Sequence, residues 1–253
     1  AKGDLPSATG SARRALAGAR RGNWSDLASD AHFLLGEIFG QQRLPRQSAE
    51  AFAQALEASR RVNDRGRGIR ALNALANILL DLGDYDRAFE ASAQALRLAR
   101  SVGDLRAQST ALNNVGDTHR FSGRLVAAMD SYREALTLAQ RAGTSQDVIV
   151  ILENMGSTAR RQGQIEEAAE HYDDALALAR RSGTPEHVAN LLNALAGVRL
   201  VQQRPVDAWL LAREAVDLGR SENLRRPLPR AVQNEGLAAW AMGDSETARR
   251  ALI

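Results

Sequence analysis

Apolar and small residues recur along the chain with the spacing of helices. From Leu112 to Gly123, apolar and small side chains fall three and four residues apart, which is the period of one helix face. A second stripe of this kind runs from Ala128 to Ala139, and Gly143 ends it. The pattern predicts two amphipathic helices that are joined by a short turn.

The same two stripes return every 40 residues, as the step from Gly116 to Gly156 shows. One column of small residues consists of Gly36, Ala76, Gly116, Gly156, Ala196 and Gly236. Two further columns are Ser48, Ala88, Ala128, Ala168, Ala208 and Ala248, and Ala15, Ala55, Ala95, Ala135, Ala175 and Ala215. One helix pair cannot bury its apolar face alone, so neighbouring pairs stack. The sequence therefore predicts a repeat array.

The repeats divide the whole chain into one array, 1-253. Full repeats are predicted at 29-68, 69-108, 109-148, 149-188 and 189-228, with partial repeats at 1-28 and 229-253. Because both ends fall inside a repeat, we expect the chain to be a fragment of a longer protein. Ala248, Leu252 and Ile253 would then lack a covering repeat, which predicts weak end-to-end self-association.

The small columns have an expected physical role. Gly116 and Ala128 are expected to let the two helices of one repeat approach closely, while Leu112 and Leu136 fill the space against the next repeat. Ala91 lies outside these columns and is expected to be exposed. Asp104 and Thr184 directly precede the predicted helices and are expected to be N-caps.

The order of the columns resembles the tetratricopeptide repeat. The columns in question are Leu75, Val115, Met155 and Leu195, then the small residue, then Tyr132 and Tyr172, then Ala135 and its equivalents. The period of that repeat is about 34 residues, whereas this one is 40, and Gly103, Gly143 and Gly183 replace its usual proline. These features are similar to the longer repeats of polarity adaptors, kinesin light chains and bacterial transcriptional activators. The resemblance implies an all-α fold, a right-handed α-solenoid of stacked antiparallel helix pairs whose first helices line a concave side.

Composition excludes several classes of protein. Of the 253 residues, 44% are hydrophobic and 25% are charged, which is typical of a folded soluble chain. No apolar run approaches the roughly 18 residues that a membrane span needs. Cysteine is absent, which excludes disulfides and cysteine metal sites. We therefore expect a cytoplasmic location and no membrane partner.

No motif for catalysis or for metal binding stands out. The four histidines, His32, His119, His171 and His187, do not have the spacing of metal ligands, and no phosphate-binding glycine loop occurs. His119 is expected to be a packed or groove-side residue. The carboxylates Glu166, Glu167, Asp173 and Asp174 are expected on a solvated outer helix. The sequence predicts a protein that is not an enzyme and uses no cofactor and no metal.

The predicted first helices carry a row of polar residues that could bind a partner. These candidate residues are Asn73, Asn77, Asn113, Asn114, Asp117, Arg120, Asn154, Arg160, Arg161 and Asn193. An asparagine amide can both donate to and accept from a peptide backbone, and an arginine can hold a carboxylate with two hydrogen bonds. Arg120 and Arg160 are expected to act as charge clamps outside the stacking core. The competing interpretation is a row of solvated polar residues.

Three functions are compatible with such an array. The leading one is a protein-interaction scaffold that binds an extended, acidic peptide in the concave groove, as part of a larger regulatory protein. The second is the sensing or self-assembly segment of a bacterial transcriptional activator or signalling ATPase. The third is nucleic-acid binding through Arg225, Arg226 and Arg230. It is disfavoured because the 33 basic residues are mixed with 30 acidic ones and aromatic content is 4%.

Overall fold

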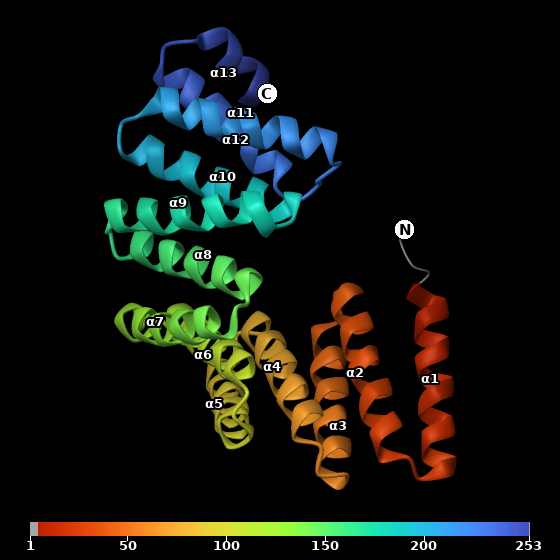
Figure 1. Cartoon of the computed structure of the whole chain (residues 1–253). Coiled ribbons are helices and arrows are strands. Elements are labelled where there is room, and N and C mark those ends of the chain that lie inside the picture. Colours follow the sequence, from red (N-terminus) through yellow and green to blue (C-terminus); the bar gives the residue numbers. More distant parts are fainter. Residues whose placement is uncertain (1–4, 253) are drawn as a thin grey trace. The chain divides into compact units, whose positions relative to one another are not determined.

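The structure of the protein is a computed structural model that describes residues 5–252. This part of the chain forms thirteen α-helices and contains no β-strand. Figure 1 labels the helices in chain order. The helices are α1 (Leu5–Gly22), α2 (Ser25–Gln41), α3 (Pro45–Arg61), α4 (Arg65–Asp81), α5 (Tyr85–Val102), α6 (Leu105–Phe121), α7 (Leu125–Ala142), α8 (Ser145–Arg161), α9 (Ile165–Ser182), α10 (Pro185–Val201), α11 (Pro205–Ser221), α12 (Leu228–Ala241) and α13 (Ser245–Leu252). The predicted all-α fold of helix pairs is confirmed.

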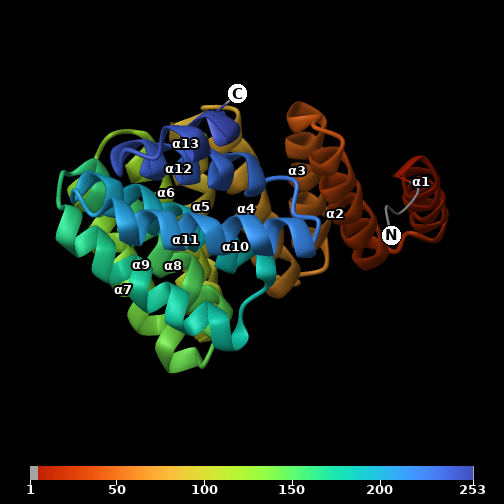
Figure 2. The same ribbon diagram turned by 90° about the horizontal axis from the view of Figure 1, so that it is seen from above.

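The helices group into two compact units. The first unit is Ala1–Ala142 and contains α1 to α7, and the second is Gly143–Ile253 and contains α8 to α13. Within each unit every helix packs against the next one in sequence. The first helices of successive repeats also touch, as α2, α4 and α6 do in one unit and α10 and α12 in the other. Helices α10 and α11 lie side by side in both views (Figures 1 and 2).

The alanine columns lie at the interfaces between helices. Ala88, Ala128, Ala168 and Ala208 are all fully buried, and so are the alanines of the column from Ala55 to Ala215. Ser48 takes the place of alanine in the first of these columns, and its hydroxyl donates to the carbonyl oxygen of Gly36 at 2.7 Å. The recurring small residues are therefore packing positions, because a larger side chain has no room there.

Gly116 has a different role from the expected one. A Cβ atom at Gly116 would lie 2.5 Å from a ring carbon of Tyr132, far inside contact distance. The glycine thus makes room for an aromatic ring of the second helix in the same repeat. The same relation joins Gly156 to Tyr172 and Gly36 to Phe52.

The repeats without an aromatic ring support this explanation. Ser92 and Ala212 occupy the position of Tyr132 in the repeats that begin with α4 and α10. Their first helices carry Ala76 and Ala196 in the glycine column, and both alanines are fully buried. An alanine is accommodated where the facing side chain is small.

The expectation for Ala91 is wrong, because this residue is buried. Its side chain is 8% exposed and belongs to an apolar cluster with Ala55, Leu72 and Ala111. Helix α5 packs against α4 of its own repeat and against α6 of the next one. A helix held on two sides buries a wider stripe than the columns alone suggest.

The helix starts and the turns follow the expected chemistry with one exception. The Asp104 carboxylate accepts a hydrogen bond from the Ala107 amide at 2.9 Å, which confirms it as an N-cap. Thr184 accepts one from the His187 amide at 3.4 Å. Gly103, directly before Asp104, has a φ of 71°, a left-handed conformation that glycine adopts without strain. Gly183 instead has a φ of −88°, because the Thr184–Pro185 step continues in extended backbone.

Candidate functional site

The predicted polar residues of the first unit lie on α4 and α6. The amide of Asn114 donates to both the backbone oxygen and the side-chain oxygen of Asn73, at 3.4 Å each. Asn114 is 3% exposed. Its amide therefore bridges two successive first helices, α4 and α6, and is itself satisfied. Asn77, one turn beyond Asn73, is exposed.

A triangle of hydrogen bonds joins the hydroxyl of Tyr132 to the side chains of Asp117 and Arg120. The Tyr132 hydroxyl donates to Asp117 Oδ1 at 2.7 Å and accepts from Arg120 Nε at 3.1 Å. Arg120 Nη2 closes the triangle by donating to the same oxygen of Asp117 at 2.8 Å. Asn113 adds a hydrogen bond to the other Asp117 oxygen at 3.2 Å. This cluster connects α6 to α7.

The triangle neutralises most of the charge that Arg120 brings. Its side chain and that of Asp117 are only 16% and 15% exposed. Burial, followed by the nearby Asp117 carboxylate, raises the pKa of Tyr132 well above its usual value of about 10. The tyrosine is therefore a neutral hydrogen-bonding partner. Arg120 thus takes part in packing between α6 and α7, contrary to its expected place outside the stacking core.

The second unit holds a related cluster on α8 with one important change. Tyr172 occupies the position of Tyr132, and Arg160 that of Arg120, but Ser157 replaces Asp117. Burial raises the pKa of Tyr172, while the Arg160 charge and hydrogen bonds with Ser157 and Arg160 oppose that shift. The third corner is thus a hydroxyl in place of a carboxylate. Arg160 and the adjacent Arg161 are both exposed.

Asn193 also lies in the second unit, and it is buried. Its amide donates to the Pro227 carbonyl at 3.0 Å, and its backbone carbonyl accepts from the Asn234 amide at 3.0 Å. Asn234 therefore repeats, on α12, the bridging role that Asn114 has on α6. The sequence analysis missed Asn234, although its 40-residue spacing to Asn114, over three repeats, was a usable signal.

Exposure separates the ten predicted residues into three groups. Asn77, Arg160 and Arg161 are exposed, Asn73, Asn113, Asp117, Arg120 and Asn154 are half-buried, and Asn114 and Asn193 are buried. The buried members stabilise contacts between helices. The exposed members remain the candidates for contact with a partner.

Other predicted features of the chain have plain structural roles. His119 packs against Phe89 with ring centroids 5.4 Å apart, and burial, followed by the charge of Arg124, lowers its pKa. Asp173 pairs with Arg199 at 2.8 Å. Among residues 5–252, no three acidic or histidine side chains gather as a metal site would require. No helix in that range is long and apolar enough to cross a membrane.

The candidate apolar end of the chain is described only in part. Ala248, on α13, is 4% exposed and so is covered within its own unit. The side chain of Leu252 and the whole of Ile253 lie outside the described residues. The predicted self-association stays a prediction.

Several solved structures share the fold of this chain, and the names of some of these proteins include tetratricopeptide repeats. BtubC from P. vanneervenii is 20% identical, with 82% of this chain and 88% of that chain covered and a TM-score of 0.73. A Rap conjugation gene regulator of plasmid pLS20, solved with the Phr* peptide, is 13% identical, with 92% and 64% covered and a TM-score of 0.72. A signal transduction ATPase of Pyrococcus horikoshii with a tetratricopeptide repeat sensor is 13% identical, with 90% and 36% covered and a TM-score of 0.74.

These similarities and the stacked helix pairs define a tetratricopeptide-type α-solenoid, as the column order implied. A comparison with curated proteins gave no match. The family model of the MalT-like TPR region matches residues 71–253, which is most of the chain. The chain belongs to this family.

Proposed function

We propose that this chain is a protein-interaction scaffold whose first helices bind an extended, acidic segment of a partner. The observation that carries the proposal is the contrast between α6 and α8. Arg120 on α6 is paired with Asp117 and half-buried, whereas Arg160 on α8 is exposed together with Arg161. Helix α8 therefore presents two adjacent exposed guanidinium groups, and a serine stands where the previous repeat has Asp117.

The chemistry of these side chains favours an acidic partner. Two neighbouring guanidinium groups can hold carboxylates with paired, charge-assisted hydrogen bonds. Attraction between exposed charges also speeds the encounter with an acidic chain. The Rap regulator of similar fold was solved with a peptide, which supports a peptide-like ligand for this array.

A second candidate function is the sensing segment of a regulatory protein. The match to the MalT-like TPR region and the similarity to the sensor-bearing ATPase favour it. In that function the chain would be one segment of a longer protein, and the same face would bind another segment of that protein. Binding of an added acidic peptide would then be weaker in such a longer protein than in this chain alone.

Fluorescence anisotropy with a labelled glutamate oligomer tests the leading proposal. The double variant Arg160→Glu with Arg161→Glu should weaken binding at least tenfold, about 1.4 kcal/mol, because attraction becomes repulsion. Arg220→Glu is the matched control, since Arg220 is exposed on the second helix α11. Equal weakening by the control, or equal binding of a lysine oligomer, would contradict the proposal.

The same anisotropy assay at rising salt, and with nucleic acid as the ligand, distinguishes peptide binding from nucleic-acid binding. Binding of the glutamate oligomer should weaken as salt rises, since exposed charges are screened. Single-stranded DNA and RNA of matched length should bind no better than the glutamate oligomer. Tighter binding to either nucleic acid, with a steep salt dependence, would favour the third function instead.

A further inference from the structure

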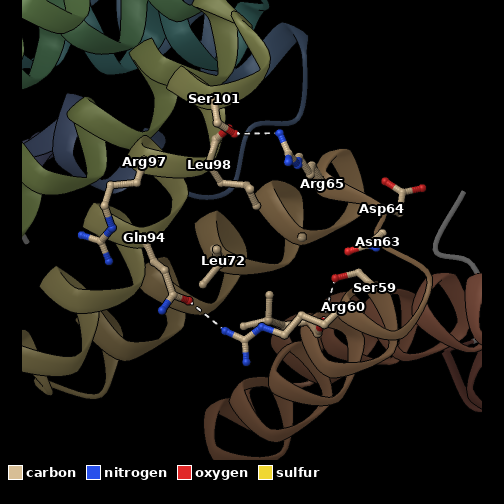
Figure 3. Close-up of a pocket in the computed structure, with 12 residues that line it drawn as sticks. Ser59, Arg60, Asn63, Asp64, Arg65, Leu72, Gln94, Arg97, Leu98 and Ser101 are labelled. Carbon is tan, nitrogen blue, oxygen red and sulfur yellow. Dashed lines mark hydrogen bonds between the residues drawn. The ribbon is translucent and has the colours of Figure 1, made fainter.

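The first unit contains a cavity that the proposed peptide-binding face does not use. Its volume is about 500 Å³, and it lies among α3, α4 and α5 (Figure 3). The second helices α3 and α5 form its sides, and the first turns of α4 lie between them. Leu56, Leu72 and Leu98 give it an apolar lining. This volume lies within the range of cavities that bind small molecules.

One residue that lines the cavity distinguishes this repeat from the three that follow. Gly68 lines it, and the same position in the next three repeats holds Gln108, Val148 and Val188. A Cβ atom at Gly68 would contact Leu98 and Ser59 at 3.3 Å each. A side chain such as valine would therefore extend into the space that the glycine leaves open.

The charge around the cavity also differs from the equivalent places in other repeats. At two equivalent places an arginine of one second helix pairs with a glutamate of the following second helix. Arg100 pairs with Glu134 at 2.9 Å, and Arg180 pairs with Glu214 at 2.8 Å. At the cavity the arginine is Arg60, and its partner is the neutral Gln94 at 3.1 Å (Figure 3).

Two more arginines at the cavity have weak or no pairing. Arg65 donates to the hydroxyl of Ser101 at 3.3 Å, which adds no counter-charge. Arg97 makes no hydrogen bond or ion pair with any residue that the structure describes. Both line the cavity together with Arg60, so three positive charges surround one apolar hollow.

The acids nearby do not offset this positive charge. Asp64 lines the cavity, but its carboxylate is bound to the Arg67 side chain at 2.5 Å and to the Arg67 amide at 2.9 Å. Glu57 lies 3.9 Å from Arg60 and 3.8 Å from Arg61, so it is shared at the limit of ion pairing. The cavity therefore combines an excess of guanidinium groups with an apolar floor.

We propose that this cavity binds a small organic carboxylate with an apolar body. The apolar part would contact Leu56, Leu72 and Leu98, where burial removes it from water. The carboxylate would accept hydrogen bonds from Arg60 and Arg97, taking the place that Glu134 has beside Arg100. The glycine that opens the space lies on α4, and the glutamine that gives Arg60 a neutral partner lies on the next helix, α5.

Isothermal titration calorimetry with phenylacetate, indoleacetate and octanoate tests the proposal on the whole chain. Phenylacetamide and indoleacetamide are the matched neutral probes. At least one carboxylate should bind, and its amide should bind at least tenfold more weakly because the amide carries no charge. Failure of all three carboxylates to bind, or equal binding of carboxylate and amide, would overturn the proposal.

Variants locate the binding to this cavity. Gly68→Val fills the hollow, Gln94→Glu places a carboxylate beside Arg60 as Glu134 does beside Arg100, and each should weaken binding of the carboxylate ligand at least tenfold. Gly197→Ala and Arg220→Gln are matched controls, because a Cβ at Gly197 meets nothing within 4 Å and Arg220 is exposed on α11. Thermal unfolding shows whether Gly68→Val remains folded, and Gln94→Glu is an exposed change that leaves the packing intact.

Three results would contradict the assignment even if a probe binds. Undiminished binding by both Gly68→Val and Gln94→Glu would place the probe elsewhere. A short peptide with a free carboxyl terminus that binds at least tenfold more tightly than all three carboxylates would make the occupant a peptide end. Tighter binding of phenyl phosphate than of phenylacetate would replace the carboxylate with a phosphate.

Discussion

Replacing Gly116 by alanine tests whether the glycine column exists to accommodate the aromatic ring. The added Cβ would lie 2.5, 2.7 and 2.9 Å from three atoms of the Tyr132 ring. The nearest of these must move by about 1 Å to reach ordinary contact distance. Tyr132 is fully buried and its hydroxyl is bonded to Asp117 and Arg120, so the ring cannot move without weakening those bonds.

The expected magnitude combines two opposing effects. Overpacking of a buried site costs about 1–3 kcal/mol. Alanine is a better helix former than glycine by about 1 kcal/mol, which offsets part of this cost. We therefore expect Gly116→Ala to lower the free energy of unfolding by up to about 2 kcal/mol. Gly197→Ala, on α10, should raise it by up to about 1 kcal/mol, because a Cβ there meets nothing within 4 Å.

A double-mutant cycle separates the ring from other causes. The pair Ala76 with Ser92 occurs naturally in the repeat that begins with α4. In the Tyr132→Ser background, Gly116→Ala should therefore no longer destabilise the protein, and the two changes should be non-additive by about 1–3 kcal/mol. Urea unfolding followed by far-ultraviolet circular dichroism measures all four proteins. The explanation is refuted if Gly116→Ala lowers the free energy of unfolding equally in the Tyr132→Ser background and in the otherwise unchanged protein. It is also refuted if Gly116→Ala stabilises the protein as much as Gly197→Ala does.

Two further predictions concern packing and pH. In urea unfolding, Ala168→Leu should lower the free energy of unfolding by about 1–3 kcal/mol, because Ala168 is fully buried. Ala177→Leu, on the exposed side of the same helix, is the control and should change the free energy of unfolding by less than about 0.5 kcal/mol. Since the pKa of Tyr132 is raised in the folded state, its contribution to stability should be constant below about pH 10 and fall above it, where the unfolded tyrosine ionises first. Tyr132→Phe should show a shallower loss across that alkaline range in thermal unfolding, and an unchanged slope would mean that Tyr132 does not contribute to it.

The sequence by itself determined the class of fold. Because each helix pair repeats after 40 residues, columns such as Ala128 and Ala168 could be recognised as packing positions from spacing alone. Burial of an amphipathic stripe depends on which residues share a helix face, and that is a local property of the chain. The order of the columns was also enough to indicate the tetratricopeptide repeat.

Only the tertiary structure decided which polar residues are available to a partner. Asn77 and Asn114 look alike in the sequence, yet one is exposed and the other bridges two helices. Arg120 and Arg160 share a column, but Asp117 pairs with Arg120, whereas Ser157 and Arg160 each hydrogen-bond to Tyr172. Whether a polar side chain is exposed depends on what packs against its helix from other repeats.

The cavity at Gly68 and the burial of Ala91 have the same origin. Each depends on how α5 packs against α4 and its neighbours, which no single helix pattern contains. Gly68 and Gln94 lie 26 positions apart in the chain, and only the packing of α4 against α5 brings them to one hollow. Helix periodicity fixes which face of a helix is buried, whereas contacts between helices fix what that face encloses.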